Sequence, residues 1–314
     1  MRGVDWVFLM DVLICIGKQG EEWRTALEAC MPEARLHVGP DSPACDYAVV
    51  WHPPAGLWER QRRLKALFSL GAGVNGLLAL PSLPLDVPLV RMEDGGMAGQ
   101  MTEYALYVAL REFRRFPDYR QDQLRARWAP RTARSRSDFR IGVLGLGVLG
   151  GAVARALAEF GFDVSGWSRG AKAVAGVDCR HGPQGLDVVL ERSHVLMLLL
   201  PATGATAGLL DQSRLAQLPA GAVVVNLSRG ELVDQGALLE ALDSGRVSAA
   251  YLDVFEHEPL PSDHAFWQHP AVRITPHVAA LTDTRLACEQ IADKIRRLEA
   301  GLPISGVVDR SRGY

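Results

Sequence analysis

Three residues in the second half of the chain combine the chemistry that reduction of a carbonyl compound requires. Arg229 offers a forked set of guanidinium donors, which suits a carboxylate or a carbonyl oxygen. His277 can deliver a proton near neutral pH, and the carboxylate of Glu258 would stabilise its charged form. Each residue taken singly is better explained as an ordinary structural residue. Because each follows an apolar run of strand length, the three together indicate one active site.

A glycine-rich turn follows the apolar run 139–144 and opens a helix that ends near residue 160. Gly145 would permit a tight turn, Gly147 would let a pyrophosphate approach the backbone, and Gly150 would let helix and strand pack closely. The turn therefore predicts a dinucleotide site formed by Gly145, Leu146, Gly147, Val148, Leu149 and Gly150. The alternative is a purely structural turn, or one that binds another nucleoside, as in methyltransferases.

The end of the next expected strand, 163–167, separates NAD from NADP. An NAD enzyme places an acidic residue there, but here the nearest acid, Asp163, begins the strand. Ser168 and Arg169 can instead bond a 2′-phosphate. We therefore predict that NADPH is preferred over NADH, with the cofactor contacted at Trp167, Ser168, Arg169 and Lys172.

The elements that position these residues follow from apolar runs that alternate with helix-like segments. Strands are expected at 12–16, 47–51, 67–70, 139–144, 163–167, 195–200, 222–227, 249–254 and 272–275. Helices are expected at 21–31, 57–67, 102–116, 149–160 and 231–244. This alternation predicts an α/β protein with doubly wound parallel sheets, and 314 residues predict two domains. Ligands in such sheets bind beyond the carboxyl ends of the strands, where the three candidate residues should meet.

Composition narrows the class of protein. Lys and Arg number 34 and Asp and Glu 36, so no overall basic field indicates a nucleic-acid partner. The apolar run 4–16 contains two aspartates and is too short to span a membrane. The five cysteines form no Cys-x-x-Cys pair and the histidines show no metal-like spacing, so we expect no metal site and a cytoplasmic protein.

Arginines are dense between residues 111 and 136. They could form a nucleic-acid-binding strip, or they could belong to a solvated helix and linker. Nearby acidic residues, Glu112, Asp118 and Asp122, favour the helix and linker.

Taken together, the motifs resemble the D-isomer-specific 2-hydroxyacid dehydrogenase family, and within it the members that reduce glyoxylate and hydroxypyruvate. The resemblance covers nearly the whole chain. It includes the glycine turn, Ser-Arg229-Gly, Asp253-Val-Phe-x-x-Glu258-Pro-Leu, Thr-Pro-His277, Trp51-His-Pro-Pro, Ser69-Leu-Gly-Ala-Gly-Val-Asn75 and the closing 308–314 segment. It implies a Rossmann nucleotide domain inserted into a flavodoxin-like substrate domain. The implied boundaries are 1–98 and 282–314 for the substrate domain and 99–281 for the nucleotide domain.

The resemblance also implies residue roles. Arg229 would bind a small 2-keto acid, His277 would be the acid/base, and Glu258 would orient and charge His277. Ala72 and Gly73 would present backbone amides to the substrate carboxylate, and Asp253 would meet the nicotinamide carboxamide. The 111–136 stretch lies where the family often has a dimerisation arm, so a homodimer is expected.

One departure from the family pattern is Asn75, which stands where an aspartate is usual. An amide donates as well as accepts hydrogen bonds, so we expect altered substrate preference rather than lost activity. Two other functions stay open. The chain could be a nucleotide-sensing, corepressor-like binding protein on the same fold, or an enzyme acting on another acid such as phosphite or formate.

Overall fold

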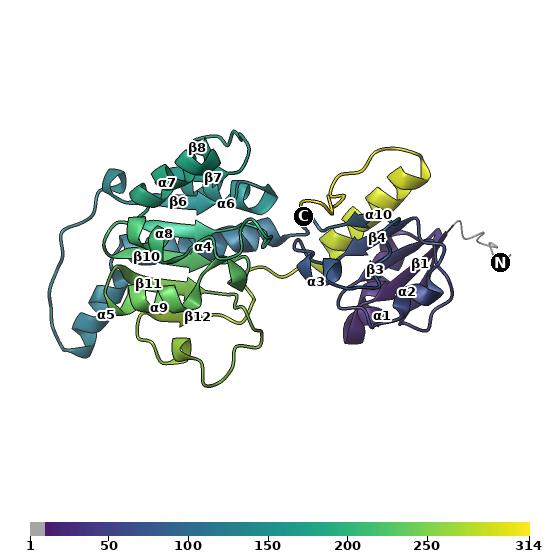
Figure 1. The fold of residues 1–314 in the computed structure, drawn as a ribbon, viewed down its shortest axis with the longest axis horizontal. Coiled ribbons are helices and arrows are strands. Elements are labelled where there is room, and N and C mark those ends of the chain that lie inside the picture. The colour runs from purple at the N-terminus through teal and green to yellow at the C-terminus, as the bar shows by residue number, and fades with distance from the viewer. Residues whose placement is uncertain (1–9) are drawn as a thin grey trace. The chain divides into compact units, whose positions relative to one another are not determined.

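The structure is a computed structural model that describes residues 10–314. The chain divides into two compact units: a terminal unit of residues 10–96 and 282–314, and a central unit of residues 97–281 (Figure 1). Each unit contains one parallel sheet, which confirms the predicted α/β class with two doubly wound sheets. No helix among residues 10–314 is both long and apolar enough to cross a membrane.

The terminal unit is built on a five-stranded sheet in the order β2-β1-β3-β4-β5. Its strands are β1 (Met10–Cys15), β2 (Ala34–Val38), β3 (Tyr47–Val50), β4 (Ala66–Ser69) and β5 (Leu89–Val90). Its helices are α1 (Gly20–Cys30), α2 (Leu57–Arg60), α3 (Asn75–Leu78) and α10 (Thr284–Glu299). The C-terminal segment joins the same sheet, because the amide of Val308 donates to the carbonyl of Leu89 at 2.8 Å.

The central unit is built on a seven-stranded parallel sheet in the order β12-β11-β10-β9-β6-β7-β8. Its strands are β6 (Arg140–Leu144), β7 (Asp163–Ser168), β8 (Asp178–His181), β9 (Val195–Leu198), β10 (Ala222–Asn226), β11 (Val247–Leu252) and β12 (Val272–Ile274). Its helices are α4 (Met97–Phe113), α5 (Phe116–Leu124), α6 (Val148–Glu159), α7 (Gly182–Arg192), α8 (Gln212–Gln217) and α9 (Gln235–Asp243). The chain runs outward from β6 in both directions, so the strand order reverses between β6 and β9. That reversal is where ligands bind in open α/β sheets.

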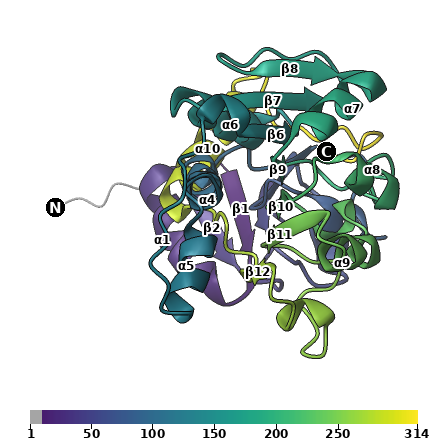
Figure 2. The same cartoon turned by 90° about the vertical axis from the view of Figure 1, so that its left-hand side faces the viewer.

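Two apolar layers enclose the central sheet. One face packs against α7, α8 and α9 through Leu190, Leu215 and Leu238. The other packs against α4 and α6 through Val108 and Leu157. Figure 2 shows the strands from β8 to β12 in a row between these two sets of helices. Because both faces are covered, the inner strands β9 and β10 are buried along their whole length.

Two predicted helices differ from the observed ones, and two edge strands were not predicted. The helix expected at 57–67 ends at Arg60, because the buried Gln61 side chain turns inward to bond the amide of Cys45 and the carbonyl of Pro43. The helix expected at 102–116 is broken into α4 and α5, with Pro117 in the first turn of α5. The strands β2 and β8 were not predicted, since each is a half-exposed edge strand without an apolar run.

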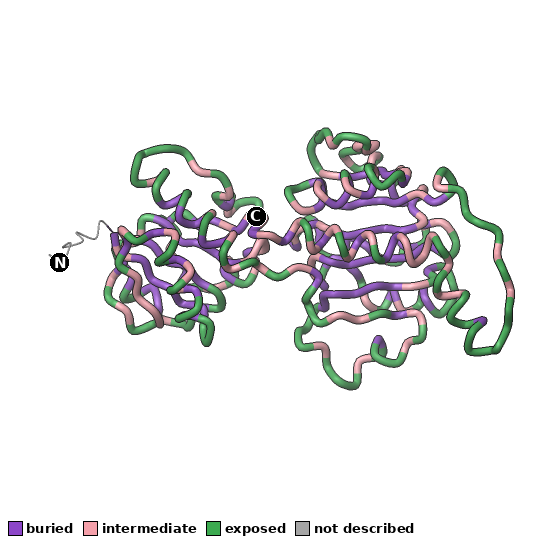
Figure 3. Tube along the Cα trace, turned by 180° about the vertical axis from the view of Figure 1, so that it is seen from behind, coloured by how far each residue is buried: buried purple, intermediate pink, exposed green. Residues whose placement is uncertain are grey.

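The stretch rich in arginine contains α5 and an extended, mostly exposed segment, 125–135, that follows it (Figure 3). Arg131 pairs with Asp122 at 2.5 Å, so part of the basic charge is neutralised locally. The guanidinium of Arg136 lies 5.7, 5.0 and 5.0 Å from the rings of Phe113, Phe160 and Phe162, which anchors the end of the segment to the central unit. These contacts agree with a helix and linker.

Candidate active site

The glycine turn lies between β6 and α6, at the reversal of strand order. Gly145 has φ +106°, and a Cβ there would lie 2.4 Å from the carbonyl oxygen of Leu199. A Cβ at Gly150 would lie 1.8 Å from the carbonyl oxygen of Gly145. Gly147 differs, because no atom of the described chain lies within 4 Å of a Cβ added there. The first and third glycines are therefore required by the fold, whereas the second leaves open space beside the N-terminus of α6, where an anion is favoured.

The end of β7 lies directly beside this turn. The carbonyl of Trp167 accepts a bond from the amide of Gly145 at 2.8 Å, and its indole N–H donates to the carbonyl of Gly182 at 2.8 Å. Ser168 is half-buried and its hydroxyl donates to the carbonyl of Gly170 at 2.8 Å, while Arg169 is exposed. Residues 167–172 contain no carboxylate, so the polar side chains that this segment offers to a cofactor ribose are hydroxyl and cationic.

Arg229 follows β10 in a turn that its neighbours hold. The side-chain amide of the buried Asn226 donates to the carbonyl of Arg229 at 2.8 Å, and its oxygen accepts from the amide of Ser228 at 3.2 Å. Gly230 lies so close to the next turn that a Cβ there would be 1.9 Å from the carbonyl carbon of Phe255. Any side chain at residue 230 would therefore separate the Arg229 turn from the turn that carries Glu258.

The Arg229 guanidinium is half-buried, and Nη1 donates to the carbonyl of Ser228 at 2.6 Å. Burial lowers the pKa of Arg229 from its ordinary value, and the nearby carboxylates of Glu231 and Glu258 oppose that shift. Arginine nevertheless keeps its charge in proteins. This residue therefore supplies a permanent, partly desolvated cation, the kind of group that interacts strongly with carboxylates.

Glu258 and His277 form a direct pair. Glu258 Oε2 lies 2.7 Å from Nδ1 of His277, and Oε1 accepts from the amide of Phe255 at 3.0 Å. A carboxylate only accepts, so the Nδ1–H of His277 donates to it and Nε2 is the ring nitrogen available to a substrate. The two side chains are 35% and 46% exposed, so the pair is open to a ligand.

Asp253 lies beneath this pair at the end of β11 and is 1% exposed. Its carboxylate accepts from the hydroxyl of Thr275 at 2.6 Å and from the amides of Val278 and Ala279, each at 2.9 Å. Its main-chain carbonyl accepts from the amide of His277 at 2.8 Å. In this structure Asp253 thus holds the loop that carries His277. The contact with a nicotinamide carboxamide stays a prediction.

The structure therefore brings together residues from three successive strand ends. Arg229 follows β10, Glu258 follows β11 and His277 follows β12, which are adjacent in the sheet. An imidazole, its carboxylate partner and a cation thus lie at the same carboxyl edge of the sheet, and the role of each stays a prediction.

The segment with the predicted substrate amides belongs to the terminal unit, where it follows β4. The Trp51 indole covers Gly71, since a Cβ at Gly71 would lie 2.6 Å from the ring. Ala72 and Gly73 come next, and among residues 10–314 neither amide has a hydrogen-bond acceptor. Asn75 begins α3, and its carbonyl accepts from the amide of Ala79 at 3.0 Å.

Sequence reasoning missed the residues that hold the site in place. Asn226 ends the buried strand β10 and Thr275 follows the edge strand β12, and a polar side chain at a strand end is the one signal that would have indicated them. The loop after β9 was also missed. The carbonyl of Leu199 in this loop lies so close to Gly145 that residue 145 has no room for a side chain. The hydroxyl of Thr206 donates to the carbonyl of Pro201 at 2.6 Å.

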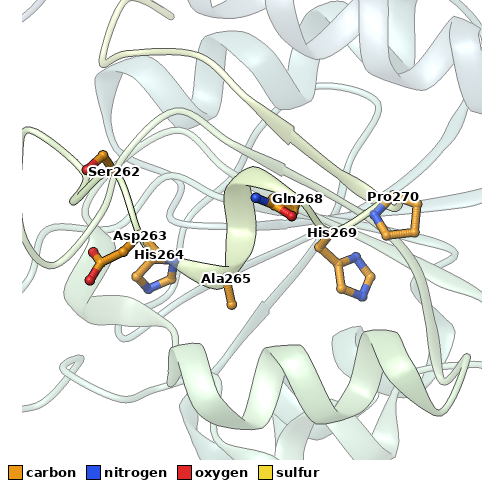
Figure 4. Close-up of a pocket in the computed structure, with 7 residues that line it drawn as sticks. All are labelled: Ser262, Asp263, His264, Ala265, Gln268, His269 and Pro270. Atoms are coloured by element: carbon orange, nitrogen blue, oxygen red, sulfur yellow. The ribbon is translucent and has the colours of Figure 1, made fainter.

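A separate surface cavity of about 460 Å³ lies in the loop between β11 and β12 (Figure 4). It is lined by Ser262, Asp263, His264, Ala265, Gln268, His269 and Pro270. Nδ1 of each histidine accepts from a nearby backbone amide at 3.2 Å, so both rings stabilise the loop. None of the predicted site residues lines this cavity. Across residues 10–314, no three His, Cys, Asp or Glu side chains are grouped to hold a metal ion.

Comparison with known proteins shows to which family this chain is related. Residues 106–279 match the model of the D-isomer specific 2-hydroxyacid dehydrogenase, NAD binding domain. The chain belongs to the D-isomer specific 2-hydroxyacid dehydrogenase family. The resemblance noted from the sequence motifs is thereby confirmed.

Relatives of this family extend the similarity to nearly the full chain. A glyoxylate/hydroxypyruvate reductase A from Serratia proteamaculans is 47% identical over 302 residues, which is 94% of this chain and 96% of that protein. A family member from Xanthobacter autotrophicus, solved with NADPH and MES, is 41% identical with a TM-score of 0.91, covering 96% and 99% of the two chains. An NADPH-dependent glyoxylate/hydroxypyruvate reductase from Sinorhizobium meliloti, solved with NADP and sulfate, is 37% identical with a TM-score of 0.90, covering 97% and 99%.

Proposed function

We propose that this protein reduces a small 2-keto acid, glyoxylate or hydroxypyruvate, to the D-2-hydroxy acid with NADPH as the reductant. The observation that carries the proposal is the Glu258–His277 pair beside Arg229, at the edge of the sheet that holds the glycine turn. Relatives named glyoxylate/hydroxypyruvate reductase A cover more than nine-tenths of the chain, which supports the choice of substrate.

The residues present fit a dinucleotide phosphate. The space beside Gly147 and the amides at the start of α6 suit a pyrophosphate. Ser168, Arg169 and Lys172 would hold the 2′-phosphate, because the end of β7 has no carboxylate to repel it. When bound, NADPH supplies the hydride. Two similar proteins were solved with NADPH or NADP, which supports the same preference here.

The side chains of the central unit account for the rest of the chemistry. Arg229 binds the carboxylate of the keto acid and orients its carbonyl group. As the keto carbon is reduced, His277 transfers its Nε2 proton to the carbonyl oxygen, so the product is the neutral alcohol. The Glu258 carboxylate holds the ring in position and stabilises its protonated form. The cation of Arg229 also offsets the negative charge that develops on the oxygen.

The terminal unit would act as the substrate domain and the central unit as the nucleotide domain, with boundaries near residues 98 and 281. The free amides of Ala72 and Gly73 support this assignment, because two adjacent unpaired N–H groups suit a carboxylate.

We also propose a homodimer formed through the arm of residues 111–136. This arm exposes Trp128 (97%), Leu124 (64%) and Phe116 (50%), which is unusual for large apolar residues on a monomer. Light scattering after gel filtration should give twice the mass of the chain. A Trp128→Ser, Leu124→Ser variant should give one chain's mass, and a monomeric parent protein would contradict the proposal.

A cofactor and substrate panel tests the activity. Loss of NADPH absorbance is measured with glyoxylate, hydroxypyruvate and larger 2-keto acids, and formation of NADPH is measured with phosphite and formate. We expect turnover with the two small keto acids and its loss in His277→Ala. Tight NADPH binding without turnover of any keto acid would indicate a nucleotide sensor instead. Near-normal turnover in His277→Ala would overturn the assignment of the proton donor.

A further inference from the structure

His277 lies in a backbone conformation that a residue with a side chain rarely adopts. Its φ is +54°, in the left-handed region that favours glycine. Such a conformation persists only where surrounding bonds hold it, and it is common where a side chain must be aimed. The contact between His277 and Glu258 therefore depends on whatever holds residues 275–279 in place.

Asp253 provides the inner part of that support. Four hydrogen bonds join it to this loop: its carbonyl accepts from His277, and its carboxylate accepts from Thr275, Val278 and Ala279. Because Asp253 is 1% exposed, water does not compete for these bonds.

The network continues beyond Asp253 to helix α4. Oγ1 of Thr275 lies 3.0 Å from the hydroxyl of Tyr104, which is 171 residues earlier in the chain. A threonine hydroxyl has one proton, and here it goes to the carboxylate of Asp253. The Tyr104 hydroxyl must therefore donate to Thr275. The direction of each bond in the chain Tyr104→Thr275→Asp253 is thus fixed.

The surroundings of Tyr104 agree with a donor role. Burial raises the pKa of its phenol, and the charge of Asp253 acts in the same sense, although the bond to Thr275 opposes them. The phenol is therefore protonated at neutral pH and can donate. Hydrogen bonds in such a chain strengthen one another, so loss of the outer bond also weakens the inner one.

We propose that Tyr104 and Thr275 are positioning residues for His277: their hydroxyls tie the loop 275–279 to Asp253 and to helix α4, and thereby hold the imidazole against Glu258. The proposal rests on the proposed function only in that His277 is the proton donor. Neither hydroxyl touches the reacting atoms, so both act through the loop.

Three variants test the kinetic consequence. Thr275→Val keeps the shape and removes the hydroxyl, Tyr104→Phe removes the outer donor, and Thr275→Ser restores the bond. We expect kcat to fall about ten- to a hundredfold in Thr275→Val, and less in Tyr104→Phe, because a small displacement of a catalytic group is costly. The KM for NADPH should change less than about twofold, and Thr275→Ser should recover most of the kcat.

Tyr251→Phe is the matched control. The Tyr251 hydroxyl is also buried against α4, where it donates to Glu112 and accepts from Arg111 at 2.8 Å, about two helical turns from Tyr104. It has no bond to the loop 275–279. Its loss should lower the melting temperature and leave kcat unchanged. Wild-type kcat in folded Thr275→Val and Tyr104→Phe, or an equal loss of kcat in Tyr251→Phe, would overturn the proposal.

A second measurement does not depend on turnover. The Nδ1 proton of His277, bonded to Glu258, should give a downfield resonance in the proton spectrum that is absent from His277→Ala. This resonance should shift or broaden in Thr275→Val and return in Thr275→Ser. An unchanged resonance in Thr275→Val would overturn the positioning role. If the wild-type protein reduced no keto acid but the resonance responded as expected, the proposed activity would fail and the positioning of His277 would stand.

Discussion

Glu258 Oε2 lies 2.7 Å from Nδ1 of His277, and the same carboxylate is fixed through Oε1 by the amide of Phe255. The imidazole is thus held by a group that is itself anchored to the backbone of its own turn. The orientation of Nε2 therefore depends on this one side chain.

Replacement of this carboxylate should lower the rate of reduction. In Glu258→Gln we expect kcat to fall about a hundredfold, because the imidazole of His277 loses the anchored carboxylate that holds it in position. The measurement is the steady-state rate of keto-acid reduction. Glu256→Gln is the control, because Glu256 is an exposed carboxylate two residues earlier, and its kcat should match the wild type. A wild-type kcat in Glu258→Gln would contradict the role.

Substitutions at two glycines of the turn should have different effects, one on the stability of the fold and the other on cofactor binding. Gly150→Ala forces a Cβ to within 1.8 Å of a carbonyl oxygen, so we expect a loss of roughly 1–3 kcal/mol in the free energy of unfolding. The methyl group of Gly147→Ala meets no atom of residues 10–314, and the φ of −74° at this position suits alanine, so stability should change by less than about 0.5 kcal/mol. NADPH binding should nevertheless weaken in Gly147→Ala, because the methyl group occupies the space left for the pyrophosphate. Thermal unfolding with and without NADPH measures both effects, and wild-type affinity in Gly147→Ala would place the pyrophosphate elsewhere.

Cofactor preference should depend on Arg169. A hydrogen bond to a charged group contributes about 1.5–3 kcal/mol, so Arg169→Ala should weaken NADPH binding by roughly ten- to a hundredfold. NADH binding should be unaffected, since NADH has no 2′-phosphate. Fluorescence titration of the two cofactors provides the measurement, with Arg155→Ala, on the neighbouring helix α6, as a control for general loss of positive charge. An equal loss of NADH affinity would show that Arg169 does not bind the 2′-phosphate.

Acid stability of the terminal unit should depend on Glu299. Hydrogen bonds from Lys65 Nζ at 2.6 Å and from the Tyr47 hydroxyl at 2.5 Å lower the pKa of Glu299 below its ordinary value. A carboxyl with a lowered folded-state pKa stabilises the fold above its unfolded-state value of about 4.3, and this contribution is lost as the pH falls through the folded-state pKa. Glu299→Gln should therefore be less stable than the wild type at neutral pH, by about 0.5–1 kcal/mol, and should approach it near pH 3. Urea unfolding at a series of pH values checks this, and a constant difference across the series would refute it.

Much of the fold could be predicted from local pattern. The buried parallel strands appear as unbroken apolar runs, and the glycine turn at residues 145–150 marks where the chain passes from strand to nucleotide-binding helix. The edge strands β2 and β8 were missed because their half-exposed residues form no such run. Helix α2 was predicted too long because the Gln61 side chain ends it through bonds to residues 43 and 45, which spacing does not reveal.

The candidate site likewise contains residues that could be predicted from the sequence and residues that could not. Arg229, Glu258 and His277 could be found because each carries distinctive chemistry at a strand end. The support for His277 could not, because it joins Tyr104 to residues 253 and 275, and a hydrogen bond between such distant residues depends on how the helix packs on the sheet. The left-handed backbone at His277 was also hidden, since histidine is not a residue type that signals it.

The division of the chain into units has a consequence for synthesis on the ribosome. The central unit is one continuous segment, so residues 97–281 can complete their sheet as soon as they have emerged. The terminal unit begins first and finishes last, because helix α10 packs against α1 and supplies the buried Cys288, Ile291 and Ile295. The five strands of this unit therefore lack the apolar residues of α10 until residues 284–299 have been translated. A chaperone that protects nascent chains would therefore be expected to act on the first 96 residues rather than on the central unit.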